Sequence, residues 1–378
     1  MRWPLSAAPD AARVASRVVA RRWALRTRLL APLFASLLAA LLALLTAPAQ
    51  ACPICATGGE LTPAQRLINA DQVLLLAPAP QGWQTRAVIK GEPAAPPAAE
   101  ALPVPAPIAM PSSASGPVPW LAARDRYSGQ WALYGPVGAD HAPVLARAAS
   151  AQRTADMRIE DWVERVRFYA PYLEHREPLL AELAYSEIAR APYAAMRSLR
   201  GTVDPAQLAR WLDDPALAAR APLYTLLLGI AGDAQTVPRV ERALAESRKT
   251  RVPADPSALI CALIELRGRE ALTQIERLYL TDRSGDPAQA RGALLALSVQ
   301  GQADGVLPRA DVIAAYRRLI QRRHPLAGLA AADLAAWQAW EVTPDYVALL
   351  NSSTLHPVSR VAIVSYLERS PHPAAKGR

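Results

Sequence analysis

Two of the three cysteines in this 378-residue sequence lie close together, in the motif Cys52-Pro53-Ile54-Cys55. A Cys-x-x-Cys pair can act as a redox dithiol, supply half of a metal site or close a local disulfide. Redox pairs usually open a helix within a βαβ unit, and no such pattern follows Cys55. In an exported protein, which the preceding residues indicate, the default is a structural disulfide between Cys52 and Cys55. A metal or redox role and a lipidated Cys52 are the alternatives.

A metal bound at this motif would be a soft one, such as Cu or Zn, because thiolates are soft ligands. Cleavage directly before Cys52 would free an α-amino group that adds a third donor. A closed zinc site needs four ligands, and the histidines form no ligand pair at helical or zinc-finger spacing. The five histidines are His141, His175, His324, His356 and His372. The sequence therefore predicts no cofactor, with copper or zinc at Cys52 and Cys55 as the alternative.

Residues 1–51 have the pattern of an export signal. Residues 21–28 are basic, residues 29–46 form an uncharged apolar run, and Ala49-Gln50-Ala51 supplies the small-x-small pattern of a cleavage site. Cleavage is expected between Ala51 and Cys52, which places the mature protein in the periplasm or cell envelope. The alternatives are an uncleaved membrane anchor, since the apolar run approaches the length of a spanning helix, and a lipoprotein anchored through Cys52.

The net charge of +9 belongs mostly to this leader. Up to Ala51 the chain has seven Arg and one acidic residue, Asp10, so the remainder has 42 − 7 = 35 basic and 33 − 1 = 32 acidic residues. The mature charge of +3 and the lack of a basic stripe interleaved with aromatic residues argue against nucleic-acid binding.

Residues 52–140 are expected to form a small β-rich domain. Short apolar runs at residues 71–77 and 83–91 are separated by turn residues, and residues 120–123 and 130–134 flank the hairpin-like pair Ser128-Gly129. Residues 92–119 are rich in Pro and Ala and have few large apolar side chains, so they are expected to form an insert largely without regular structure.

Residues 158–370 change to a helical period, after an expected linker at residues 141–157, and residues 371–378 are expected to be a flexible tail. Prolines open successive Ala/Leu-rich segments, and four of them are preceded by an aspartate that can cap the first turn: Asp204, Asp214, Asp255 and Asp286. Segments 223–232 and 258–266 are nearly all apolar, whereas segments 239–246 and 270–280 are amphipathic. Alternating inner and outer helices are typical of an α-solenoid. The expected fold is therefore mainly α: a HEAT-like α-solenoid preceded by a small β-containing N-terminal domain.

The mature chain also resembles an uncharacterised family of exported HEAT-like helical-repeat proteins from planctomycetes and related bacteria. The residues that carry this resemblance are the Cys-Pro-x-Cys opening and segments 168–175, 184–187, 191–193, 223–224, 228–229 and 335–340. The resemblance spans residues 52 to about 373, and the Pro/Ala-rich insert departs from it. It implies the architecture and export, and it implies no activity.

Other side chains are better explained by packing than by chemistry. Cys261 lies in the most apolar segment and is expected to be a buried, inert thiol. Trp337 and Trp340, three residues apart, are expected on one helical face, where they pack or form a surface for a stacked ligand. The expected function is a non-enzymatic scaffold that binds an unknown protein partner of the envelope, contacting a membrane only through an uncleaved leader or a lipidated Cys52. The alternative is a thiol-redox or metal-handling protein that acts through Cys52 and Cys55.

Overall fold

The computed structural model describes most of the chain after residue 51. The described residues are 52–55, 61–80, 82–92, 97–98, 102, 112–113, 116–153, 157–249, 255–302 and 305–376. The predicted leader, with Ala49 and Ala51 of its cleavage site, lies outside them. The chain divides into two units, Met1–Ala49 and Gln50–Arg378, and all described residues belong to the second.

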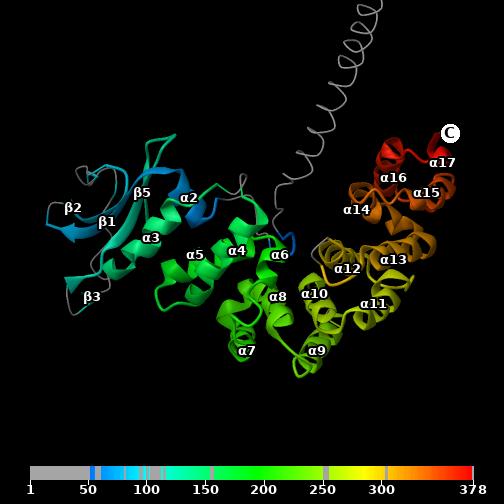
Figure 1. The fold of residues 1–378 in the computed structure, drawn as a ribbon, viewed down its shortest axis with the longest axis horizontal. Helices are drawn as coiled ribbons and strands as arrows, with labels where there is room; N and C mark the ends of the chain where they lie inside the picture. The colour runs from blue at the N-terminus through cyan, green and yellow to red at the C-terminus, as the bar shows by residue number, and fades with distance from the viewer. Residues whose placement is uncertain are drawn as a thin grey trace, which may run out of the picture. The chain divides into compact units, whose positions relative to one another are not determined.

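A four-stranded antiparallel sheet lies in the N-terminal part of this unit (Figure 1). Its order is β2-β1-β5-β6. The strands are β1 (Ala70–Ala79), β2 (Gly82–Lys90), β5 (Trp120–Asp125) and β6 (Trp131–Pro136). Strands β5 and β6 form a hairpin whose turn contains Gly129 at φ +69°, a left-handed conformation that glycine adopts without a Cβ clash. All four strands match the sequence prediction.

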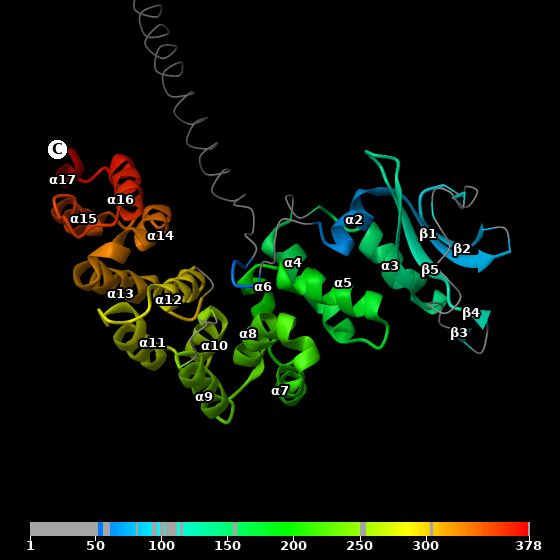
Figure 2. The ribbon, with the colours of Figure 1, turned by 180° about the vertical axis from the view of Figure 1, so that it is seen from behind.

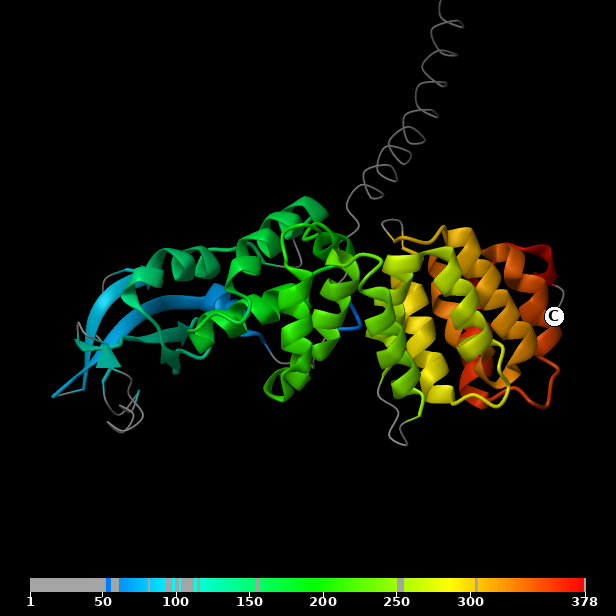
Figure 3. The same cartoon turned by 90° about the horizontal axis from the view of Figure 1, so that it is seen from below.

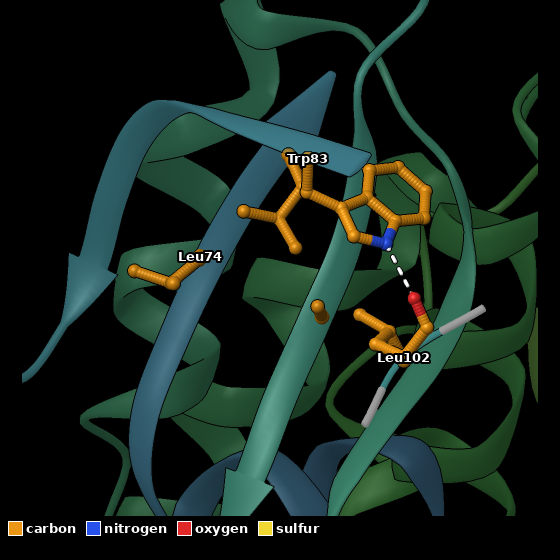
Figure 4. Close-up of a cluster of buried hydrophobic side chains, with 5 residues drawn as sticks. Leu74, Trp83 and Leu102 are labelled. Carbon is orange, nitrogen blue, oxygen red and sulfur yellow. Dashed lines mark hydrogen bonds between the residues drawn. The ribbon is translucent and has the colours of Figure 1, made fainter. Parts of the chain in front are cut away.

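The core of the sheet includes a residue of the Pro/Ala-rich insert. Leu102, from the insert, is buried with Leu74, Trp83 and Ala122. Figure 4 shows the indole N–H of Trp83 pointing to the carbonyl oxygen of Leu102, to which it donates a hydrogen bond at 2.7 Å. The insert also contains a short antiparallel pair, β3 (Ser112–Ser113) and β4 (Gly116–Pro117). A buried indole needs an acceptor, and this one is supplied by the insert.

Two segments that were expected to lack structure contain helices. The predicted linker, residues 141–157, holds α3 (Ala142–Ala149), which packs on β2 and on α2 (Pro63–Asn69). Its apolar side chains Leu145, Ala148 and Ala149 are buried, so an amphipathic pattern was present in this short segment. The predicted tail holds the short helix α17 (Pro373–Lys376).

From residue 159 onward the described chain is helical. The α-helices are α4 (Ile159–Tyr169), α5 (Pro178–Ala189), α6 (Tyr193–Arg197), α7 (Pro205–Asp213), α8 (Ala221–Ala231), α9 (Val237–Ser247), α10 (Ser257–Arg267), α11 (Arg269–Ile275), α12 (Pro287–Gln300), α13 (Arg309–Arg322), α14 (Ala331–Ala336), α15 (Thr343–Leu349) and α16 (Pro357–Arg369). Shorter turns of 3₁₀-helix separate several of them: η4 (Ala170–Tyr172), η5 (Pro215–Arg220), η7 (His324–Ala330) and η8 (Trp340–Val342). A π-helical turn, η6 (Glu276–Leu280), extends α11.

The predicted helix starts are confirmed at three of the four aspartates. At the fourth, Asp255, the N-cap of α10 is Pro256 instead, although the Asp255 side chain accepts a hydrogen bond from the N–H of Ser257 at 2.9 Å. The side chains of Asp204, Asp214 and Asp286 accept hydrogen bonds from the backbone N–H two residues later, with proline at the first helical turn in each case. These caps satisfy backbone donors that have no partner within the helix.

Neighbouring helices pack in chain order. Helix α8 packs against α10, and α10 packs against α12, while α7 contacts α8 and α9 contacts α10. Figures 1 and 2 show α8, α10 and α12 following one another, and Figure 3 shows the same succession from below. Helices α8 and α10 are buried along most of their length, whereas α9 buries only Val240, Leu244 and Ser247. The predicted division into inner and outer helices is confirmed for these three. Among the described residues, no helix is both long enough and apolar enough to cross a membrane.

Candidate functional site

The Cys-x-x-Cys segment is held against the helical region. The backbone N–H of Cys52 donates to the carbonyl oxygen of Ala191, between α5 and α6, at 3.1 Å. The N–H of Cys55 donates back to the carbonyl of Cys52 at 3.3 Å, which closes a tight turn. Figure 1 draws this short blue segment beside α6. Cys52 is 1% exposed and Cys55 is 3% exposed, so both cysteines lie inside the protein surface, while Pro53 between them is exposed.

The predicted Cys52–Cys55 disulfide is absent from the structure, in which both residues are free thiols. The two side chains share a hydrogen bond instead, and this bond lowers the pKa of Cys52. The same bond, together with burial, raises the pKa of Cys55 well above its ordinary value. The pKa values of the two thiols are thus shifted in opposite directions by the hydrogen bond that they share.

The third cysteine belongs to the same buried region, which the sequence did not indicate. Cys261, in α10, is fully buried, and its negative form would raise the pKa of Cys55. Burial and the proximity of Cys52 raise the pKa of Cys261 itself. All three cysteines of the chain are therefore close enough to interact electrostatically. We call Cys52, Cys55 and Cys261 the thiol cluster.

A buried glutamine borders the thiol cluster. The side-chain amide of Gln300, at the end of α12, donates to Cys261 Sγ at 3.2 Å, to the Cys261 carbonyl oxygen at 3.3 Å and to the Tyr193 hydroxyl at 3.1 Å. Its carbonyl oxygen accepts from the N–H of Val306 at 3.0 Å. Since Gln300 is fully buried and bonded at both ends, it holds α6, α10 and α12 in one arrangement.

A buried carboxylate continues this network. The Tyr193 hydroxyl donates to Glu265 Oε2 at 3.0 Å, and burial raises the pKa of Tyr193 well above its ordinary value. Arg197 and Arg200 donate to Glu265 Oε1 at 3.0 Å and 2.6 Å. The two arginines reach toward solvent while the carboxylate is fully buried. The two arginines thus neutralise the charge of Glu265 from the solvent side, and the Tyr193 hydroxyl donates a hydrogen bond to it from the protein interior.

The chemistry open to the thiol cluster is restricted by its burial. A thiolate at Cys52 would be a nucleophile or a soft ligand, but attack on a dissolved reagent requires access to the sulfur atom. Around a single ion, ligand atoms must also lie close together. Among the described residues, three potential metal ligands have their ligand atoms within 4.8 Å of one another. They are Asp140, His141 and Glu177, and they do not include the cysteines of the thiol cluster.

The two tryptophans predicted to share a helical face are separated by the end of α14. This helix ends at Ala336, and Gln338 adopts φ +57°, which turns the chain between them. The Trp337 ring stacks on Tyr316 with centroids 5.8 Å apart, and the Trp340 ring packs on Tyr366 at 5.2 Å. The shared face is therefore a wrong prediction, because Gln338 breaks the helix. A ligand-stacking role for Trp337 and Trp340 stays a prediction.

A shallow surface hollow of about 560 Å³ lies next to the Glu265 network. It is formed by the turn after α8 and the junction of α10 with α11. Its lining includes Arg200, Ala234, Glu265, Arg267 and Glu270. The mixture of charges and the openness to solvent are typical of a surface that meets another macromolecule rather than an enclosed small-molecule pocket.

No family model, no curated protein and no solved structure matches the chain.

Proposed function

We propose that the chain is a non-enzymatic, protein-binding scaffold of the cell envelope whose helical region is a HEAT-like solenoid. The observation that supports this proposal is the packing of α8, α10 and α12 in chain order, with α7 and α9 beside α8 and α10. In a solenoid each helix pair contacts its neighbours, and successive pairs build an extended surface for a partner. The family resemblance carried by the sequence favours the same architecture.

The charged hollow beside Glu265 is the part of this surface that we assign to the partner. It draws residues from consecutive helices, as binding surfaces of stacked repeats do. Its polar lining suits a protein partner with complementary charge.

Site-specific photo-crosslinking tests this assignment in native cells. Ala234 is exposed within the hollow, so a photo-reactive phenylalanine analogue placed there should cross-link one defined protein. Ala332 in α14 is exposed outside the hollow and serves as the matched control position. Equal cross-linking at both positions, or no adduct at Ala234, would contradict the assignment.

Export and mature processing belong to the same proposal. The leader pattern supports cleavage between Ala51 and Cys52, and intact-mass measurement of the protein recovered from the periplasm tests it. A mass that begins at Cys52 supports soluble export. A mass that includes the leader, or one increased by a diacyl group, would replace it with a membrane anchor or a lipoprotein.

A second candidate function, thiol-redox or metal handling, is favoured by one observation. The structure adds Cys261 to Cys52 and Cys55, so three thiols rather than two lie in one buried region. Copper(I) and zinc prefer such soft ligands. Cys55→Ser should abolish stoichiometric copper binding and disulfide exchange if this function is correct. If the scaffold function is correct, the same substitution should change only the stability of the N-terminal segment.

A further inference from the structure

We propose that Asp140, His141 and Glu177 form a zinc site at the junction between the sheet and the helical region. His141 closes η2 (Ala139–His141), the turn that follows β6, and Glu177 directly precedes α5. The two residues are far apart in sequence, and the fold brings them together. This site is separate from the thiol cluster and from the surface that we assign to a protein partner.

The spacing of the ligand atoms suits a metal ion better than direct hydrogen bonds. His141 Nε2 lies 3.5 Å from Glu177 Oε1 and 3.8 Å from Asp140 Oδ2. These separations exceed an ordinary hydrogen bond between nitrogen and oxygen. Two ligands about 2.1 Å from a tetrahedral zinc ion are roughly 3.4 Å apart, which is close to the separations found here.

The imidazole of His141 lacks another partner for its ring nitrogen. Nε2 is buried and accepts or donates no hydrogen bond among the described residues. A buried polar atom of this kind normally has a partner, which can be a protein group, water or an ion. Because Nε2 faces two carboxylates, a divalent cation satisfies all three groups together.

Glu177 is already oriented for binding through one oxygen. Its Oε2 accepts a hydrogen bond from the backbone N–H of Gly138 at 3.0 Å, which leaves Oε1 directed at His141. A Cβ atom at position 138 would lie 3.0 Å from Glu177 Oε1 and closer still to Asp140 Oδ1. The absence of a side chain at Gly138 therefore leaves room for the carboxylate oxygens. Hydrogen bonds that fix a ligand in this way strengthen metal sites.

His175 has a positioning role. Its ring meets the His141 ring edge to face, with centroids 5.2 Å apart and an interplanar angle of 89°. Its Nδ1 accepts from the N–H of Glu177 at 3.2 Å, so Nε2 carries the proton in the neutral form and is not a free donor atom for a metal. The ring instead fixes the plane of His141. With three protein ligands and an exposed Asp140, the fourth position is open to water.

This arrangement contains a single histidine ligand and two carboxylates, so it differs from the helical and zinc-finger histidine pairs that the sequence lacks. Sequence spacing could not reveal it, because His141 and Glu177 lie on different elements. The zinc ion would join the turn after the sheet to the start of α5, and so would fix the sheet region to the helical region.

Zinc affinity of the full chain, measured by competition with a chromophoric chelator, tests the proposal. We expect one zinc ion per chain, a loss of about 100-fold in affinity for His141→Ala or Glu177→Gln, and a loss of about 10-fold for Asp140→Asn. Glu177→Gln keeps an acceptor for Gly138 and tests the ligand if His141→Ala fails to fold. His324→Ala, which alters a partly exposed histidine elsewhere, should bind zinc as the wild type does.

Cobalt separates this site from the thiol cluster. Co²⁺ bound by nitrogen and oxygen ligands should show no thiolate-to-metal charge-transfer band. Such a band, lost on Cys55→Ser, would overturn the proposal by assigning the metal to the thiol cluster. Zinc affinity unchanged in both His141→Ala and Glu177→Gln would overturn it as well.

Discussion

In α5 the carboxylate of Glu187 is 1% exposed and meets the buried Arg165 and the largely buried Arg190. In the sheet, the carboxylate of Asp71 meets Arg124 at 2.7 Å with more than a third of each side chain exposed. The charge of Glu187 is thus enclosed by the helices, while the charges of Asp71 and Arg124 are in contact with water. A buried pair that loses one partner leaves an uncompensated charge inside the protein, whereas an exposed charge is resolvated. The two regions should therefore respond very differently to the loss of one charge.

The largest effect is expected for Glu187→Ala. Removal of this carboxylate leaves Arg165 and Arg190 buried without their counter-charge, and should lower the free energy of unfolding by about 3–5 kcal/mol. Burial of the Arg165 guanidinium lowers its pKa, so this charge depends on Glu187 for compensation. Denaturant unfolding followed by circular dichroism measures the change. A loss below about 1 kcal/mol, the range of surface pairs, would remove the contrast between the two regions.

A smaller loss is expected for Gly229→Ala, which tests the packing between α8 and α10 without any charge. A Cβ at this position would lie 2.5 Å from Ala262 Cα and 2.7 Å from Ala262 Cβ, so the helices must separate. We expect a loss of about 1–3 kcal/mol from overpacking, despite the higher helix propensity of alanine. Thermal unfolding provides the measurement. A gain in stability would mean that the two helices are not in such close contact.

The carboxylate of Asp333 is intermediate between those of Glu187 and Asp71, because hydroxyl groups rather than arginines face it. Tyr316 and Ser298 donate to it at 2.8 Å and 2.9 Å, yet burial raises its pKa above 3.8. The folded protein therefore holds this proton more tightly than the unfolded chain does. Its contribution to stability is fully present below pH 3.8 and is lost as the pH rises through the folded pKa.

Asp333→Asn removes this titration. We expect the free energy of unfolding of the wild type to fall, relative to that of the variant, as the pH is raised from about 3.8. Urea unfolding of both proteins over a pH series compares the two slopes. Identical pH dependence in the two proteins would show that Asp333 titrates as an exposed carboxyl does.

The smallest effect is expected for Arg124→Ala in the sheet. The guanidinium holds the pKa of Asp71 below its ordinary value, but both groups are solvated. The unfolding midpoint at neutral pH should therefore stay within experimental error of the wild type. A clear decrease would show that the sheet depends on this pair, and would bring the two regions closer together in behaviour.

Much of the fold was predictable because local signals agree with the final packing. The strands of the sheet, the aspartate caps at Asp204, Asp214 and Asp286, and the buried helices α8 and α10 all follow from periodicity and turn chemistry. The helix α3 was missed because it is short and lies between two segments with strong patterns. Leu102 was missed because a single apolar residue in a Pro/Ala-rich stretch gives no periodic signal.

The candidate sites were predictable only in part. The Cys52–Cys55 pair is visible as a motif, but Cys261 is separated from it in sequence by the whole sheet and by helices α4 to α9. Burial of Cys261 was predicted and is confirmed, whereas its proximity to Cys52 depends on tertiary structure. A buried glutamine in an apolar segment, Gln300, was the available hint, since such an amide needs polar neighbours.

The hydrogen bond from Cys52 to Ala191 has a consequence for the order of folding. Contacts among α8, α10 and α12 join segments that are close in sequence. Such contacts lose little loop-closure entropy and therefore form early. The contact of Cys52 with Ala191 closes a much longer loop and should form last. Protection of these thiols from a pulse of alkylating reagent during refolding would then mark the last step of folding.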